Sequence, residues 1–302
     1  MTDVERVIDE TKGYYGMPVV KPPVWTWEVP AYFFVGGIAG MSAVIAFAVL
    51  ITGASYFLAR AALWIATVAS LVSAGLLVSD LGRPARFLSM LRVFKYRSPM
   101  SVGAWVLAAF GAVVALTAVL VELVPSLRDA GWSMTALRIV ILPLSGVAAC
   151  LGAVLATYTG VLIGATAVPA WAKHNQALPA HFGVAALGSA AALLELLGYA
   201  SPPLWALGAG TAAFETAIGF WVERHRHGAA DRALHAGRAG TWLRTAVVLS
   251  GPVSLLLRLS GSVSLAAASF LAGAFLSRYG WMEAGRASAE DPEAVFATQR
   301  IG

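Results

Sequence analysis

Residues 80–101 read DLGRPARFLSMLRVFKYRSPMS, a charged stretch that lies between two long apolar runs. Asp80 ends the first run, and five basic residues follow before the second begins: Arg83, Arg86, Arg92, Lys95 and Arg97. Charges this dense at the end of an apolar helix are too costly to face lipid, so they must face water, headgroups, a buried site or a partner protein. The stretch therefore marks a membrane surface, and the apolar runs beside it mark membrane-spanning helices.

The composition also indicates an integral membrane protein. The chain has 302 residues, of which 59% are hydrophobic and only 12% are charged, whereas soluble proteins usually carry about 25% charged residues. The first 30 residues contain no apolar signal-peptide core, so we expect the first spanning helix to target the chain to the membrane. Cys150 is the single cysteine, which excludes an internal disulfide and a cysteine-ligated iron–sulfur cluster within this chain.

We predict an all-α fold with eight spanning helices arranged as two four-helix bundles. Apolar runs of about 20 residues are long enough to cross a bilayer. The predicted spans are residues 31–52, 61–79, 101–124, 137–163, 182–198, 204–222, 241–257 and 263–281. A segment of residues 1–30 precedes this domain of residues 31–281, and a tail of residues 282–302 follows it. Gly36, Gly37 and Gly40 recur within the first span, which indicates close helix packing.

The distribution of basic residues predicts the orientation in the membrane. With an even number of spans both termini share one side. That side holds 16 of the 21 Lys and Arg residues, against 4 on the other side, and Arg244 lies within the seventh span. Because basic residues accumulate in cytoplasmic loops, both termini and the long connections 80–100 and 223–240 are predicted to be cytoplasmic, in a bacterial cell membrane. The basic loops also suit a docked partner; the candidate docking residues are Arg92, Lys95, Arg97, Arg224 and Arg226.

Several candidate chemical groups lie near the predicted cytoplasmic surface. Glu28 lies among aromatic residues in WTWEVPAY, residues 25–32, and either caps the first helix or lines a pocket for an aromatic, membrane-soluble ligand. Asp80 pairs with Arg83 or Arg86, accepts protons from a bound quinol, or positions the loop that contacts a redox partner. Tyr158 and His174 are either ordinary interfacial residues or hydrogen-bond partners of the two carbonyls of a quinone.

Three acids fall within or near the predicted spans: Glu122, Glu195 and Glu215. Ionisable residues in a membrane are candidates for function, and here for a proton path. Glu122 and Glu195 lie near helix ends, where a solvated helix terminus is the alternative, whereas Glu215 lies deeper. Arg244 and Arg258 are their potential partners.

The histidines disfavour a haem. A bis-histidine haem needs two inward-facing helical histidines, and of the five histidines only His181 lies near a predicted span. The His, Asp and Glu residues also show no metal-ligand spacing. We therefore expect no redox centre within this chain.

The sequence resembles the NrfD-like family, the membrane subunits of polysulfide-reductase-type complexes. The matching segments follow the family's order: WEVPAYFFVGGIAG at 27–40, DLGRPARF at 80–87, SPMSVGAW at 98–105, Tyr158-Thr159-Gly160, Pro169-Ala170-Trp171 and Leu178-Pro179. The Asp-Leu-Gly-Arg-Pro segment with its Ser-Pro-Met-Ser continuation is the specific part of the resemblance, which covers nearly the whole chain and agrees with eight helices.

The resemblance implies a quinone-binding subunit without haem. Such subunits bind menaquinone or another quinone and exchange electrons with a four-cluster iron–sulfur subunit, which connects to a molybdenum or tungsten oxidoreductase. By this resemblance the residues with proton-handling roles are Asp80, Tyr158 and Glu28, and those of the quinone pocket are Trp27, Tyr32, Arg83, Arg86 and His174. Candidates for proton movement are Glu122, Glu195, Glu215 and Arg244.

We therefore predict a quinone-reactive membrane anchor of an oxidoreductase of the formate dehydrogenase or polysulfide reductase type. Many family complexes face away from the cytoplasm, whereas the charge distribution places the docking face in the cytoplasm, which suggests a cytoplasmic partner enzyme. A secondary transporter or ion pump is an alternative supported by Glu215 and Arg244, although matched broken helices are not evident. A structural anchor without quinone chemistry is the other alternative.

Overall fold

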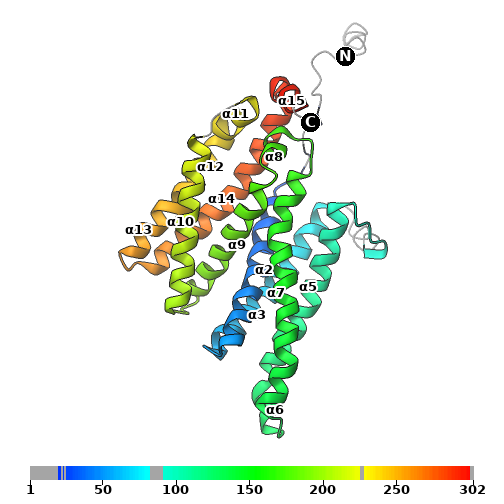
Figure 1. The fold of residues 1–302 in the computed structure, drawn as a ribbon, viewed down its shortest axis with the longest axis vertical. Helices are drawn as coiled ribbons and strands as arrows, with labels where there is room; N and C mark the ends of the chain where they lie inside the picture. Colours follow the sequence, from blue (N-terminus) through cyan, green and yellow to red (C-terminus); the bar gives the residue numbers. More distant parts are fainter. Residues whose placement is uncertain (1–19, 22, 24, 82–90, 225–227, 300–302) are drawn as a thin grey trace.

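The computed structural model describes residues 20, 21, 23, 25–81, 91–224 and 228–299. All regular secondary structure in these ranges is helical, as predicted. Figure 1 shows long helices that run side by side, with short helices at both ends of the molecule. Helices α8 (Pro169–Lys173), α11 (Ala229–His235) and α15 (Pro292–Gln299) gather at one end, hereafter the α8 end, and α6 (Val124–Asp129) lies at the other (Figure 1).

The long helices fall at the predicted positions. They are α2 (Glu28–Thr52), α3 (Tyr56–Asp80), α5 (Pro99–Glu122), α7 (Met134–Gly164), α9 (Ala177–Leu196), α10 (Pro202–Arg224), α12 (Gly237–Val248) and α14 (Val263–Glu290). Helix α12 continues through a π-helical turn, η1 (Leu249–Val253), into α13 (Ser254–Leu259). Several start where a serine caps the helix: the side chains of Ser55, Ser98 and Ser133 accept hydrogen bonds from backbone N–H groups three residues later.

Six of these helices are long and apolar enough to span a membrane: α2, α3, α5, α7, α9 and the continuous segment 237–259. Helices α10 and α14 occupy the positions of the other two predicted spans, but they contain Glu215 and Arg278, both 2% exposed. Length and composition alone thus identify six spans among the described residues, rather than the predicted eight.

The long helices pack as two groups of four. Helices α2, α3, α5 and α7 form the first group, and α9, α10, α12–α13 and α14 form the second. Helix α9 joins the groups by packing on α2 and α7 as well as on α14. A β-carbon at Gly40 in α2 would lie 2.1 Å from the carbonyl oxygen of Gly152 in α7, so only glycine permits this close backbone contact.

The predicted C-terminal tail and one predicted connection both contain helices. Helix α14 continues beyond residue 281 to Glu290, and α15 then packs against α8 and α11. Residues 223–240 likewise contain α11 and the first turn of α12. The α8 end is therefore a layer of short helices that covers the ends of the long ones.

Candidate functional site

Four of the predicted site residues line one cavity at the α8 end of the first helix group: Glu28, Tyr32, Asp80 and Tyr158. They come from the start of α2, the end of α3 and the last turns of α7. The cavity has a volume of about 30 Å³, and since a water needs about 10–15 Å³ it has room for roughly two waters in this conformation. We call it the carboxylate cavity.

The two carboxylates of this cavity are linked by one hydroxyl group. Thr26 Oγ1 donates to Asp80 Oδ1 at 3.1 Å, and the same hydroxyl contacts Glu28 Oε2. A threonine hydroxyl has a single hydrogen, so it can donate to only one carboxylate at a time. The shared hydroxyl therefore brings the two carboxyl groups to one point beside the cavity.

The two tyrosines form the inner wall of the cavity. Tyr32 in α2 is 4% exposed and Tyr158 in α7 is 8% exposed, and α7 packs on both α2 and α5. Gly103 in α5 makes room for Tyr158, because a β-carbon there would lie 2.3 Å from the phenolic oxygen. The phenol is thus held in place by packing.

The segment that carries Thr26 is held by the second half of the chain. The ring of Trp25 stacks on that of Trp171, with centroids 5.6 Å apart and planes 13° apart. Arg286 donates to the carbonyl of Trp25, and the hydroxyl of Tyr279 donates to the carbonyl of Trp27 at 2.9 Å. Helix α14 therefore fixes the start of α2.

The structure places two of the predicted quinone-pocket residues elsewhere. Trp27 is 62% exposed and lines a separate groove with Trp242 and Tyr279 instead of the carboxylate cavity. His174 lines a larger cavity in the second helix group, described below. Arg83 and Arg86 lie outside the described residues.

The docking candidates lie at the surface where they are described. Arg92, Lys95, Arg97 and Arg224 are exposed, and Arg226 lies outside the described residues. Arg97 also stacks on the ring of its neighbour Tyr96, which is itself 72% exposed. These cations are accessible to a partner protein.

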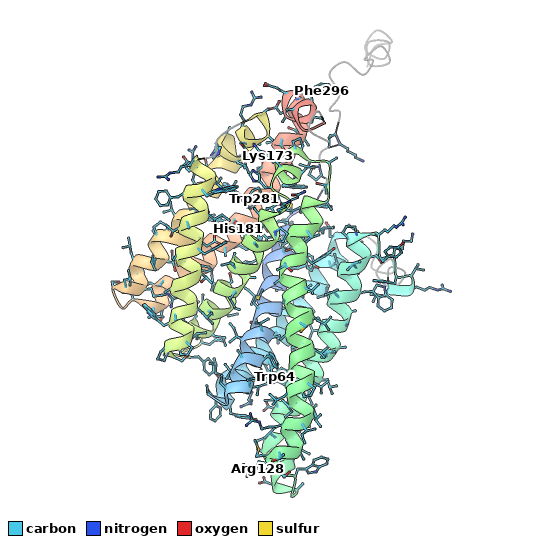
Figure 2. The ribbon with its side chains drawn as sticks, viewed as in Figure 1. Trp64, Arg128, Lys173, His181, Trp281 and Phe296 are labelled. Atoms are coloured by element: carbon cyan, nitrogen blue, oxygen red, sulfur yellow. The ribbon has the colours of Figure 1, made fainter. Side chains whose placement is uncertain are left out.

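His174 belongs to a cavity of about 350 Å³ between α9, α10, α12 and α14, which we call the histidine cavity. His174 Nε2 lies 3.2 Å from Asp231 Oδ1, and Lys173 Nζ lies 2.6 Å from Asp231 Oδ2. Burial lowers the pKa of the His174 imidazole below its ordinary value, against the opposing effect of Asp231. In Figure 2, Lys173, Trp281 and His181 descend in this order from the α8 end into the bundle.

Two of the three predicted membrane acids are closed in ion pairs. Glu122 accepts from Arg60 at 2.6 Å, near Trp64 at the end opposite α8 (Figure 2). Glu195 forms a buried two-bond pair with Arg258, at 2.5 and 2.8 Å. Pairs of this kind are compatible with a structural role for both acids.

Arg244 is not the partner of a membrane acid. It is exposed on α12 and donates to the carbonyl of His235 at 3.1 Å. Of the two potential arginine partners named from the sequence, Arg258 alone pairs with one of these acids.

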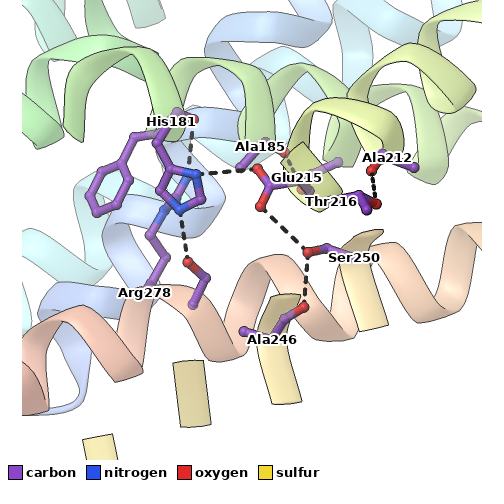
Figure 3. Close-up of polar contacts among 11 residues, drawn as sticks. His181, Ala185, Ala212, Glu215, Thr216, Ala246, Ser250 and Arg278 are labelled. Atoms are coloured by element: carbon purple, nitrogen blue, oxygen red, sulfur yellow. Dashed lines mark hydrogen bonds and ion pairs between the residues drawn. The ribbon is translucent and has the colours of Figure 1, made fainter. Parts of the chain in front are cut away.

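Glu215 faces a different set of groups, shown in Figure 3. Its Oε1 lies 3.3 Å from His181 Nδ1, and its Oε2 accepts from Ser250 at 3.5 Å. Ser250 belongs to the π-helical turn η1, and such turns commonly re-aim side chains at functional sites. Within the described residues neither Glu215 Oε1 nor His181 Nδ1 has a partner in hydrogen-bonding geometry.

Arg278 adds a buried positive charge close to this set. Its guanidinium lies 3.8 Å from the centre of the Phe182 ring and donates to the Phe182 carbonyl at 3.0 Å. Glu215 and Arg278 are each 2% exposed, so both charges lie inside the protein rather than toward lipid. Elsewhere in the described ranges, no group of three His, Cys, Asp or Glu residues could hold a metal ion.

The first helix group lies within a segment that matches a known protein family. The family model described as polysulphide reductase, NrfD, matches residues 17–201, more than half of the chain. The chain belongs to the NrfD family. Members are membrane subunits of polysulfide and nitrite reductase-type complexes, and the match covers every residue of the carboxylate cavity. Among curated proteins no sequence matches the chain.

Sequence reasoning missed Thr26, Asp231 and Arg278 as members of these sites. Thr26 stands beside the predicted Glu28, so its proximity along the chain was an available signal. Asp231 is an acid among many basic residues, and a buried acid on a short helix leaves no periodic pattern. Arg278 lies near the end of the last predicted span, where a long cationic side chain usually reaches the membrane surface.

Proposed function

We propose that this NrfD-family protein is the quinone-reactive membrane anchor of an oxidoreductase complex. One observation carries the proposal: two carboxyl groups, Glu28 and Asp80, share the hydroxyl of Thr26 and line a cavity with two buried tyrosines, at the end of a membrane helix. Quinone reduction and quinol oxidation both need groups that exchange protons at a membrane surface. The carboxylate cavity supplies such groups within the part of the chain that the family match covers.

In quinol oxidation, two electrons and two protons leave the ligand. The protons pass from the ligand hydroxyls to Asp80 and Glu28, which must be reached directly or through one water. Tyr158 and Tyr32 orient the ring by hydrogen bonds. A docked iron–sulfur subunit would accept the two electrons, and quinone reduction would reverse these proton transfers.

Quinone entry requires the carboxylate cavity to widen, because its present volume of about 30 Å³ is smaller than an aromatic ring. Trp25 and Met100 lie at its edge, and Met100 is 44% exposed. Methionine is flexible and adapts readily to a ligand. Outward movement of Met100 opens the cavity toward the surface.

We further propose that all eight long helices span the membrane and that the α8 end docks an iron–sulfur subunit. The polar residues that make α10 and α14 less apolar, Glu215 and Arg278, are buried inside the bundle, so the lipid-facing surfaces stay apolar. Exposed Arg92, Lys95 and Arg97 provide the charge for docking. Glu215 with His181 is the remaining candidate for proton movement, since Glu122 and Glu195 are paired with arginine.

Substitutions in the carboxylate cavity test the proposal. Asp80→Asn removes an ionisable group and Tyr158→Phe removes a phenol, each with little change of shape. We expect each to lower quinone-linked electron transfer by about 100-fold or more, the usual contribution of a positioned acid–base group. The measurement is turnover of the intact complex in membranes with a soluble quinone analogue, after confirming by mass spectrometry that the complex is assembled.

Asp129→Asn and Tyr199→Phe are matched controls, because Asp129 and Tyr199 lie near helix termini at the end opposite α8. Both controls are expected to keep wild-type turnover. Wild-type turnover in Asp80→Asn and Tyr158→Phe would remove the carboxylate cavity from the mechanism. Purification of the chain without any iron–sulfur subunit would contradict the anchor role itself.

A further inference from the structure

The histidine cavity is more than ten times larger than the carboxylate cavity, at about 350 against about 30 Å³. Its volume falls within the range of small-molecule sites, about 300–1,000 Å³. The lining is mostly apolar and includes the aromatic residues Phe220, Trp221 and Trp281. It lies largely on α10, α12 and α14, beyond the family match, which ends at residue 201.

His174 lines this cavity, and its imidazole is paired with a carboxylate that lies behind the wall. Asp231 is buried, with its side chain 3% exposed, and it faces both Lys173 and His174. The carboxylate paired with Lys173 can only accept, so the hydrogen shared at 3.2 Å belongs to His174 Nε2. In neutral His174 the other ring nitrogen, Nδ1, is then a hydrogen-bond acceptor.

His174 is held rigidly and leaves Nδ1 without a partner among the described residues. Its side chain is 10% exposed and lies between two indole rings, with centroids 6.2 Å from Trp221 and 5.7 Å from Trp281. Burial favours the neutral imidazole, because it lowers the His174 pKa. An unfilled acceptor in an apolar, aromatic cavity selects a ligand that brings a hydroxyl donor on an apolar body.

We propose that the histidine cavity is a second ligand site, which binds the reduced, hydroxyl-bearing form of a quinone with one ring hydroxyl donating to His174 Nδ1. The class of ligand rests on the proposed function, and the site itself rests on the cavity and on the His174–Asp231 pair. A phospholipid chain satisfies the apolar walls but leaves Nδ1 without a donor. An oxidised quinone has only carbonyl acceptors, so neutral His174 favours the quinol over the quinone.

The test is photolabelling of the full chain in lipid nanodiscs with a short-chain quinol that carries a diazirine in its alkyl tail. We expect crosslinks on peptides from α10 and α12, and competition by excess unlabelled quinol. The dimethyl ether of the same quinol keeps the shape and loses both hydroxyl donors. It is expected to compete at least about tenfold less well, the effect of one unsatisfied buried polar group.

Two variants with matched controls locate the site. His174→Phe keeps the aromatic contacts and leaves Asp231 paired with Lys173, so we expect a folded protein in which the quinol competes no better than its dimethyl ether. Ile218→Trp fills the cavity and is expected to abolish the crosslinks, whereas Ile139→Trp, at a position 69% exposed on α7, is expected to leave them unchanged. An unfolding temperature close to that of the wild-type protein shows that each variant is folded.

The proposal is overturned if α10 and α12 carry no crosslink, if the dimethyl ether competes as well as the quinol, or if a fatty acid displaces the probe and the quinol does not. The last outcome identifies a lipid cavity. Crosslinks on α2, α3 and α7, together with the turnover of Asp80→Asn, report on the carboxylate cavity, so failure of either site is visible without the other.

Discussion

Thr26 is the residue on which the geometry of the carboxylate cavity depends, although it cannot itself take up a proton at neutral pH. Its hydroxyl lies between Glu28 and Asp80, residues that are 52 positions apart along the chain. Without it, the two carboxyl groups lose the hydrogen-bond partner that they share. We therefore regard Thr26 as a positioning residue for proton transfer.

Thr26→Val preserves shape and removes the hydroxyl, whereas Thr26→Ser keeps the hydroxyl. We expect Thr26→Val to lower the quinone-linked rate by about tenfold, a fraction of the usual acid–base contribution, and to shift the pH dependence of that rate. Thr26→Ser is expected to restore both. A pH profile measured on intact membranes decides the matter, and an unchanged profile in Thr26→Val would show that the two carboxyl groups act separately.

The residues of the carboxylate cavity were largely predictable from the sequence, and those of the histidine cavity were not. Glu28, Tyr32, Asp80 and Tyr158 lie near the ends of apolar helices, beside aromatic and basic residues, which is where polar groups of a membrane-surface site are expected. Asp231 joins His174 only because α11 folds back over α8, a contact that depends on tertiary packing. Local sequence pattern does not reveal such a contact.

At the scale of helices, α2 and α7 bring their backbones into direct contact at Gly40 and Gly152. A β-carbon at Gly152 would lie 2.4 Å from the carbonyl oxygen of Gly40, which matches the reverse distance of 2.1 Å. Small residues allow helices in lipid to approach in this way, and the repeated glycines of the first span made it predictable. The partner position in α7 was not predictable, because α7 carries three glycines of its own before the final one.

Gly40→Leu is expected to push α2 away from α7 and to lower the free energy of unfolding by about 1–3 kcal/mol, the usual cost of overpacking. The same change at Gly75 in α3 is the control, since a β-carbon there meets nothing within 4 Å. Thermal unfolding in detergent, followed by circular dichroism, measures both. Equal stability of the two variants would contradict tight packing at Gly40.

A proline does not always mark a helix end in this protein, as α7 shows. Pro143 lies inside it, yet the helix continues from Met134 to Gly164. Pro252, in contrast, lies in the π-helical turn between α12 and α13. A proline is therefore a poor guide to helix boundaries in this membrane protein, where neighbouring helices and polar side chains can satisfy the freed backbone groups.

For the whole molecule, the exposed cations of the long connections indicate which end faces the cytoplasm. The exposed cations Arg92, Lys95, Arg97 and Arg224 all belong to connections at the α8 end. If basic residues mark the cytoplasm, then the carboxylate cavity, the docking surface and the C-terminal helix α15 all face it.

Reporter fusions test this orientation. Fused after residue 302, green fluorescent protein is expected to fluoresce and alkaline phosphatase to be inactive, because both report a cytoplasmic C-terminus. Inserted after Gly131, between α6 and α7, the two reporters are expected to behave in the opposite way. Phosphatase activity at the C-terminus would reverse the topology and place the docking surface outside the cytoplasm.

The hold of α14 on the start of α2 has a consequence for biosynthesis. Tyr279 and Trp27 are separated by 252 residues, and at about 5–20 residues per second a ribosome needs roughly 10–50 s to make the chain between them. During that interval the first helix is already in the bilayer, but the segment before it, residues 25–27, has not yet contacted the last helix. A chain truncated before α14 lacks the hydrogen bonds from Tyr279 and Arg286 that hold the segment carrying Thr26.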